Sequence, residues 1–344
     1  MITSRDRVLR TLCHQSVDRV PRDLWTVPAT EMLREDELAE MRFRYPPDII
    51  RPDFHGPRGQ RVKGTPYEIG EYTDAWGCVW QVTRRGMVGE VVGHPLADPS
   101  QAAAYRPPWE LLEKANLSGV NRSAAATSRF VLAWSDIRPL ERLEFLHGQA
   151  AARAALSAGS KPIRDSLAIV HEFSCREAEM WASTLVDGVA WRDDWGSNHS
   201  LVIPAQAWRD LFKPLYRQYV EIIHAQDKFA FFHSDGNIAE IFDDLVDLGI
   251  DAVNAELSLM DLEALAERFR GRITFWGEID RHRVLPFGSP EEVRGAVRRV
   301  RAALDFGQGG VIAQCKWGAG VPFRNVAAVF EQWLAPTPEH APAQ

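Results

Sequence analysis

Acidic, imidazole and thiol side chains recur where apolar runs end in the second half of the chain. His233 and Asp235 directly follow the apolar run 228–232 and precede Gly236, after which a helical pattern begins. Imidazole, carboxylate and thiolate are the donors that zinc accepts in proteins, and carboxyl groups can also transfer protons. Other runs of this kind end in Asp193 and Asp194, Glu256, Glu278 and Asp280, and Cys315 and Lys316.

Each of these side chains also has a plain structural interpretation. His233 could be a hydrogen-bonded residue of the interior, and Asp235 could cap the following helix. Cys315 could be a small buried apolar residue. Glu278 could form an ion pair with the nearby Arg281. The functional interpretation therefore depends on the fold bringing these residues together.

The elements that position these residues alternate between strand and helix. Such alternation predicts a parallel sheet with crossover helices, and the number of units favours a (β/α)8 TIM barrel. The carboxyl ends of its strands meet at one mouth, where the polar residues become neighbours. The predicted strands are 48–54, 130–134, 186–191, 228–233, 252–255, 273–276 and 310–314. The predicted helices are 4–14 with a Ser4 cap, 99–117, 138–157, 163–185, 204–226, 237–248, 260–269, 290–304 and 322–334.

The remaining segments are less regular. Residues 15–47 form an irregular segment after the first helix, without a predicted strand. Between 66 and 93 the apolar period falls to about two and glycines punctuate the runs, which predicts an antiparallel hairpin excursion. Its expected strands include 67–69, 77–82 and 88–92. We predict a single barrel domain over 1–336 and a flexible tail over 337–344.

Composition narrows the class of protein. The chain has 344 residues, 45% hydrophobic and 25% charged, and a net charge of −7 that argues against a nucleic-acid surface. Its four cysteines form no CxxC pair, which is typical of a reducing compartment. The N-terminus shows no signal peptide and no window is apolar enough to span a membrane, so we expect a cytoplasmic protein.

In order along the chain, several short motifs resemble the uroporphyrinogen decarboxylase superfamily, and more closely its branch of cobalamin-dependent zinc methyltransferases. The resemblance covers nearly the whole sequence. The motifs are 4–9, the Asp18–Pro21 turn, 74–80, 94–96, 193–196, 204–208, 233–236, 249–252, 277–280 and 321–325.

The resemblance implies a (β/α)8 barrel and a zinc site. In the methyltransferase branch a His-x-Cys pair and a later cysteine hold the ion. Carried over, these positions are His233, Asp235 and Cys315, so that an aspartate stands where the branch has its middle cysteine. A carboxylate makes zinc a harder Lewis acid than a second thiolate would, which favours activating an oxygen over alkylating a thiol.

These considerations predict a corrinoid-dependent methyltransferase. Asp194 and Glu278 are the expected catalytic acids, while Arg192, Trp195, Glu256 and Trp276 are expected to contact the substrate. The chain has no corrinoid-binding Asp-x-His-x-x-Gly motif, so cobalamin would arrive on a separate corrinoid protein.

Two alternatives remain open at this stage. One is decarboxylation of a carboxylate-bearing substrate by the same acids and Arg192, although residues 24–30 lack the arginines that the decarboxylase uses for propionates. The other is a barrel that binds a ligand or partner without catalysis.

Overall fold

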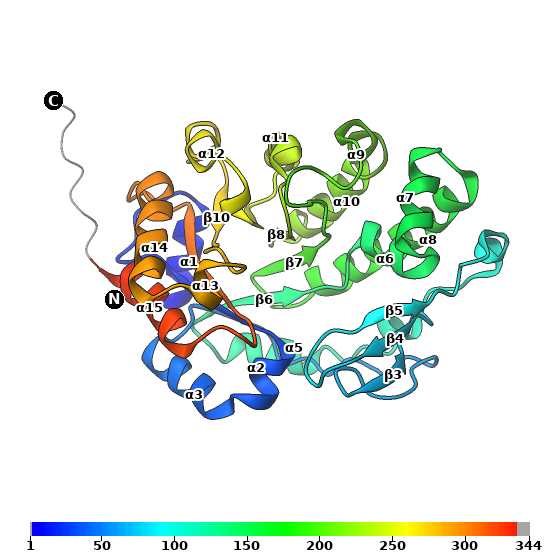
Figure 1. The fold of residues 1–344 in the computed structure, drawn as a ribbon, viewed down its shortest axis with the longest axis horizontal. Coiled ribbons are helices and arrows are strands. Elements are labelled where there is room, and N and C mark those ends of the chain that lie inside the picture. The colour runs from blue at the N-terminus through cyan, green and yellow to red at the C-terminus, as the bar shows by residue number, and fades with distance from the viewer. Residues whose placement is uncertain (1, 336–344) are drawn as a thin grey trace.

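Eight parallel strands form one curved sheet in this computed structural model, which describes residues 2–335. The strand order β1-β11-β10-β9-β8-β7-β6-β2 makes a nearly closed barrel surrounded by helices (Figure 1). Between the two end strands, the amide of Asp48 donates to the carbonyl of Arg22 over 2.8 Å. The strands are β1 (Arg22–Thr26), β2 (Ile49–Ile50), β6 (Phe130–Trp134), β7 (Gly188–Arg192), β8 (Phe229–Ser234), β9 (Ala252–Ala255), β10 (Thr274–Trp276) and β11 (Val311–Trp317).

The helices cover the outside of this barrel and one of its ends, and their order confirms the predicted (β/α)8 class. None of the helices in residues 2–335 is both long and apolar enough to cross a membrane. The α-helices are α1 (Ser4–Leu12), α2 (Pro28–Leu33), α3 (Glu35–Arg44), α4 (Glu110–Glu113), α5 (Ser118–Ala125), α6 (Pro139–His147), α7 (Gln149–Ser157), α8 (Lys161–Ala182), α9 (Ala205–Leu211), α10 (Lys213–His224), α11 (Phe242–Asp247), α12 (Leu262–Phe269), α13 (Val284–Phe287), α14 (Pro290–Leu304) and α15 (Phe323–Leu334). Short 3₁₀ helices are η1 (Pro99–Ala104), η2 (Ala239–Ile241) and η3 (Leu257–Leu259).

Side chains of alternate strand residues fill the barrel and face the helices, as the pleat of a strand requires. The inward layer is apolar at the end of the barrel opposite the mouth. There Val8 and Leu12 of α1 pack against it and close the barrel. The outward layer joins the helices in one large core. The inward-facing strand residues at the end opposite the mouth are Ile49, Phe130, Leu132, Ala190, Phe231, Ala252, Trp276 and Ile312.

A separate antiparallel sheet of three strands lies beside the barrel (Figure 1) and confirms the predicted excursion. Its strands are β3 (Gly70–Thr73), β4 (Val79–Val82) and β5 (Glu90–Gly93). The expected strand at 67–69 is wrong, because Tyr67 has a φ of 67° and belongs to the turn before β3. Trp80 of β4 packs its ring against Phe145 of α6 at 5.0 Å, which joins the small sheet to the barrel.

Several predicted boundaries are also wrong, for local reasons. The helix expected over 138–157 is two helices, because Gly148 has a φ of 86°. Pro107 and Pro108 fall inside the helix expected over 99–117, where η1 and α4 stand instead. The N-cap of α1 is Thr3, whose side chain accepts the amide of Asp6, and not Ser4. The predicted tail 337–344 lies outside the described residues.

The largest error is strand β1, which we did not predict within 15–47. It pairs along its full length with β11 and lies next to β2 at the seam of the barrel. Its inward residues Asp23 and Trp25 are polar or amphipathic, so the segment lacks the apolar alternation that identifies a strand from sequence.

Candidate functional site

The end of β7 sends alternate side chains to opposite sides of the barrel wall. Arg192 is exposed and Asp194 partly exposed at the mouth, whereas Asp193 and Trp195 are fully buried on the helix side. Asp193 accepts the amides of Leu140 and Glu141, each at 2.9 Å, and so holds the start of α6. Asp194 is therefore the acid that β7 presents to the mouth.

His233 of β8 is oriented by the neighbouring strand. The side-chain amide of Asn254 donates to the carbonyl of Trp276, so its oxygen must face His233. That oxygen lies 2.7 Å from Nδ1 of His233, which assigns the proton to Nδ1. His233 is 5% exposed, and its other nitrogen, Nε2, is left to face the mouth. A fixed tautomer of this kind is the usual arrangement for a metal-binding histidine.

Nε2 of His233 faces two carboxylates. It lies 3.0 Å from Oδ1 of Asp235, and ligand atoms of Asp194, His233 and Asp235 all lie within 4.8 Å of one another. The backbone amide of Asp235 donates to Oδ1 of Asp194 over 2.9 Å, which ties the two loops together. These three residues form what we call the His233 cluster.

Two glycines allow the loops after β7 and β8 to approach so closely. A side-chain carbon on Gly236, which has a φ of +79°, would lie 2.2 Å from the carbonyl of Gly196. A carbon on Gly196 would likewise lie 2.4 Å from the amide nitrogen of Asn237. The chain needs glycine at both positions to bring Asp194 beside Asp235.

Arg281 balances the acids around the cluster. Its guanidinium lies 2.6 Å from Oδ1 of Asp235, pairs with Glu256 and lies 3.9 Å from Glu278. Glu256 is 4% exposed and also accepts the amide of Gly236 at 3.0 Å. Burial acts to raise the pKa of Asp235, but its contacts with His233 and Arg281 outweigh this and hold that pKa far below its usual range.

Glu278 differs from its neighbours because neither carboxylate oxygen has a hydrogen-bond partner among residues 2–335, although both are buried. Burial raises the pKa of Glu278 to about 7, against the attraction of Arg281, and the charges of Asp235 and Glu256 add to the rise. A carboxyl group with this pKa can donate or accept a proton near neutral pH.

Two of the predicted site residues do not reach this cluster. Ile312, Gln314 and Lys316 of β11 face inward, so the intervening Cys315 lies in the outer core between strands and helices. Trp195 is also in the outer core, where its indole N–H donates to the hydroxyl of Tyr216 at 2.8 Å. We therefore leave Cys315 out of the proposed metal site and Trp195 out of the proposed substrate site.

Trp276 lies inside the barrel, in the floor of the mouth. It is fully buried, and its indole N–H donates to Asp23 at 2.7 Å. Its ring packs edge-on against Trp25 at 4.7 Å, and Trp25 in turn lies 5.2 Å from the ring of His233. Trp276 therefore supports the floor, whereas the partly exposed Trp25 is the ring that a bound molecule could touch.

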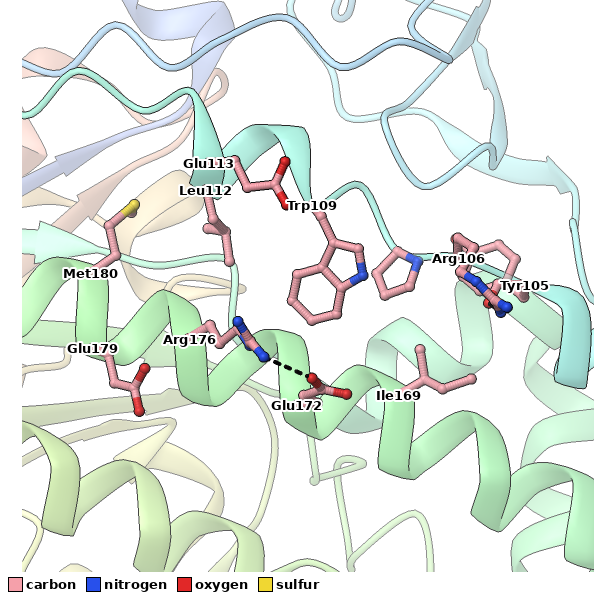
Figure 2. A pocket seen from close by; sticks show the side chains of 11 residues that line it. Tyr105, Arg106, Trp109, Leu112, Glu113, Ile169, Glu172, Arg176, Glu179 and Met180 are labelled. Atoms are coloured by element: carbon pink, nitrogen blue, oxygen red, sulfur yellow. Dashed lines mark hydrogen bonds and ion pairs between the residues drawn. The ribbon is translucent and has the colours of Figure 1, made fainter.

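A large cavity lies elsewhere, on the outside of the barrel. It has a volume of about 800 Å³ between α8 and the segment 105–113 (Figure 2). Arg176 and Glu172, one turn apart on α8, pair at 3.1 Å along its wall, and the same guanidinium lies over the ring of Trp109. These charged groups therefore satisfy one another on the wall of the cavity.

The family of the chain follows from its sequence match. Residues 147–333, just over half of the chain, match the model of the uroporphyrinogen decarboxylase (URO-D) family. The chain belongs to the uroporphyrinogen decarboxylase family. The matched region contains β7 to β11, and with them every residue of the His233 cluster.

Two solved structures can be compared with this uroporphyrinogen decarboxylase family member, and the first of them shares its fold. A methyltransferase from Methanosarcina mazei is similar with a TM-score of 0.71 and 16% identity, covering 97% of this chain and 98% of the other. An endo-β-1,4-xylanase from Gloeophyllum trabeum has a TM-score of 0.40 and 12% identity, covering 64% and 81%. No curated protein sequence matches the chain.

Three residues of this family member's site were missed by the sequence argument. Asn254 lies within a predicted strand. A polar residue inside that otherwise apolar run was the feature of the sequence that could have identified it. Arg281 was considered only as the ion-pair partner that would give Glu278 a purely structural role. Asp23 lies on the unpredicted strand β1, where burial raises its pKa to about 6 despite hydrogen bonds from two indoles.

Proposed function

We propose that the protein is a metal-assisted methyltransferase that moves a methyl group between a small oxygen-linked substrate and the cobalt of a corrinoid. The observation that carries the proposal is the fixed tautomer of His233, whose Nε2 faces the carboxylates of Asp194 and Asp235. Membership in the family and the likeness in fold to a methyltransferase support it.

The donor atoms suit a divalent ion such as zinc. Ligands that bind one zinc ion at about 2.1 Å lie roughly 3.4 Å apart in a tetrahedral site. In the His233 cluster, Nε2 of His233 lies 3.0 Å from Oδ1 of Asp235, and the ligand atoms of all three residues lie within 4.8 Å of one another. One imidazole and two carboxylates leave a fourth position for substrate. Such an ion, when bound, supplies Lewis-acid polarisation of the substrate heteroatom.

The residues of the chain divide the remaining tasks. Asn254 fixes the His233 ring, and Arg281 limits the repulsion between Asp235 and Glu256. Glu278, with a pKa of about 7, supplies or removes a proton at the substrate oxygen. A substrate with oxygen as its leaving or accepting atom fits this set, because the cluster contains no thiolate.

The corrinoid would be carried by a separate protein that docks over the open end of the barrel. The motif that binds cobalamin with a histidine is absent from the sequence. The test is therefore made with free cob(I)alamin, whose absorbance falls on methylation, and a set of small methoxylated compounds and alcohols.

The deciding experiment measures zinc binding and methyl transfer together. Zinc affinity is measured by titration calorimetry on protein stripped with chelator, for the natural chain, His233→Ala and Asp235→Asn. We expect both variants to lose at least about 10-fold in zinc affinity and at least about 100-fold in methylation rate. His55→Ala is the matched control, since the His55 side chain is 92% exposed and lies outside the cluster.

Two outcomes would overturn the proposal. One is zinc binding that His233→Ala leaves unchanged, and the other is metal-free protein that methylates cob(I)alamin at the full rate. Unfolding of the variants is excluded by comparing their urea midpoints with that of His55→Ala.

Decarboxylation is the second candidate, and Glu278 is the observation that favours it. A buried carboxyl group with a pKa of about 7 could protonate the carbon that loses carbon dioxide. Release of carbon dioxide from a carboxylate by metal-free protein, with loss in Glu278→Gln, would support this reaction against methyl transfer.

A further inference from the structure

Two arginines at the mouth have no hydrogen bond or ion pair within the part of the chain that the structure describes. Arg51 directly follows β2 and Arg192 ends β7, and both are exposed to solvent. The other arginines nearby are engaged: Arg138 and Arg142 pair with Asp136. Unpaired, exposed guanidinium groups are available to an anion.

The two guanidiniums face the same part of the mouth. In the sheet only β6 separates β2 from β7, and the guanidinium of Arg51 lies 5.4 Å from the ring of Trp134 at the end of β6. Although Arg51 reaches solvent, the protein around its side chain partly desolvates it and lowers its pKa, and the positive charge of Arg192 adds to the lowering. The two like charges therefore act on each other. Asp136 and Glu141 also act on Arg192 electrostatically, but neither forms an ion pair with it among residues 2–335.

The acids near Arg51 have other partners. Asp23 accepts hydrogen bonds from the indoles of Trp25 and Trp276, each at 2.7 Å. Glu31 accepts the hydroxyl of Thr26 at 2.5 Å. Both carboxylates attract Arg51 only at longer range, so its fork of donors stays open to a ligand.

A floor of indole rings joins this pair to the His233 cluster. The ring of Trp134 packs against Trp25 at 4.9 Å, and Trp25 packs against His233 at 5.2 Å. Trp134 and Trp25 are both partly exposed at the mouth. The rings of Trp134 and Trp25 are nearly perpendicular, so a small apolar body resting against both would have one end at the arginines and the other at the cluster.

We infer that the substrate is a small carboxylate, held by Arg51 and Arg192 at its anionic end while its body lies on Trp134 and Trp25. Two guanidiniums match a carboxylate because each can donate paired N–H groups to its oxygens. This inference rests on the proposed function for the other end of the molecule, where the oxygen-linked methyl group would meet His233. A decarboxylase also takes carboxylates, so what the inference adds is the pair of arginines that would hold the anionic end of a small methoxylated molecule.

The test compares small carboxylates with their neutral amides. A panel of aromatic and aliphatic monocarboxylates, including 4-methoxybenzoate, is titrated into the protein beside the corresponding primary amides, with tryptophan fluorescence as the signal. We expect at least one carboxylate to bind about 10- to 100-fold more tightly than its amide. Arg51→Met and Arg192→Met should each remove most of that preference, and the double variant should remove all of it.

Arg10→Met is the matched control, because Arg10 is an exposed arginine at the opposite end of the barrel. Its carboxylate affinity should equal that of the natural chain. Equal binding of acids and amides, or preference that survives the double variant, overturns the inference. So does a panel in which no carboxylate binds, or in which a phosphate monoester competes more strongly than every carboxylate.

The two proposals fail separately. His233→Ala should lose zinc and methyl transfer but keep carboxylate binding, because the arginines lie on other strands. If neutral methoxy compounds react as fast as their carboxylates, the substrate class is wrong and the methyltransferase proposal stands. If carboxylates bind through the arginines and no methyl transfer occurs, the substrate class stands and the reaction is wrong.

Discussion

The two ends of the barrel carry similar charged residues but treat them differently. At the amino ends of the strands, Asp48, Asp187 and Asp251 each stand one residue before a strand and accept the amide of a neighbouring strand at 2.7 to 2.8 Å. Each also pairs with a basic side chain: Asp48 with Arg7 and Arg19, Asp187 with Arg5, and Asp251 with His224. Every one of these acids is therefore satisfied.

At the carboxyl ends, the charges are left partly unsatisfied. Glu278 has no hydrogen-bond partner, Arg51 and Arg192 have neither a hydrogen bond nor an ion pair within residues 2–335, and Arg281 is shared among three acids. Burial of unsatisfied groups costs stability. Both ends carry carboxylates and basic side chains. Those at the amino ends pair with one another and stabilise the barrel, whereas those at the carboxyl ends remain available to a ligand.

The largest expected effect comes from breaking the satisfied end. Asp48→Ala removes the carboxylate that pairs with Arg19 and accepts the amide of Arg22, and it leaves Arg7, which is 7% exposed, with Asp18 as its remaining acid. Removing one member of a buried ion pair costs about 3–5 kcal/mol, which urea denaturation would measure. Zinc affinity of the folded fraction should not change. A variant that folds normally but loses zinc would show that the two ends are coupled.

Asp48 also fixes the pH dependence of that end. Burial acts to raise its pKa, but the hydrogen bonds and charges around it, from Arg19 above all, outweigh burial and hold that pKa below 3.8. A carboxylate whose pKa is lowered by folding stabilises the protein above its unfolded pKa. That contribution is present near neutral pH and is lost as the pH falls below about 4.

Glu278 should affect the pH dependence of stability in the direction opposite to Asp48, which Glu278→Gln can test. Burial raises the pKa of Glu278 from 4.5 to about 7, so the folded state holds its proton more tightly than the unfolded state. The stability it contributes is complete below about pH 4.5 and is lost as the pH rises to about 7, by about 3 kcal/mol. In chelator-treated protein, the unfolding free energy of Glu278→Gln should lack this decline. A parallel pH dependence in both proteins would contradict the assignment.

Gly236→Ala tests whether the loops of the carboxyl end must touch. Its new carbon would lie 2.2 Å from Gly196, in addition to the strain of a φ of +79°. We expect a loss of about 2 kcal/mol or more, together with weaker zinc binding as Asp194 and Asp235 separate. Gly249→Ala is the matched control, since its φ is +81° but its nearest contact is 3.6 Å. It should lose about 1 kcal/mol and keep its zinc affinity.

Much of the carboxyl end could be predicted from the sequence because strand ends converge in a barrel. Asp194, His233 and Asp235 were expected there, and the structure brings them together. Cys315 and Trp195 were expected for the same reason and lie outside. A strand's side chains alternate between its two faces, so two consecutive residues at a strand end point one to the mouth and one to the outer core. When the strand is buried on both faces, its apolar sequence does not show which of the two faces inward.

The remaining residues depend on neighbours that are far away in the sequence. Strand β1 was missed because its inward residues, Asp23 and Trp25, are not apolar. Asn254 acts on His233 only because β8 and β9 pair in the register that sets these two residues opposite each other. Arg51 lies within the strand predicted over 48–54, but β2 ends at Ile50, and so short a strand has no period that shows which residues face the mouth. Register and pairing of this kind come from tertiary packing.

The smallest effect is expected away from both ends, on the outer face of α8. Lys161 and Asp165 approach to 2.6 Å, but the lysine side chain is 84% exposed and the aspartate 47%. An exposed pair gains little in water and loses side-chain entropy, so Lys161→Ala should change the unfolding free energy by no more than about 0.5 kcal/mol. The distance is as short as the contact between Arg281 and Asp235 at the mouth. A loss as large as that of Asp48→Ala would mean that proximity alone determines the energy, whereas the contrast between the barrel ends requires burial and missing partners to determine it.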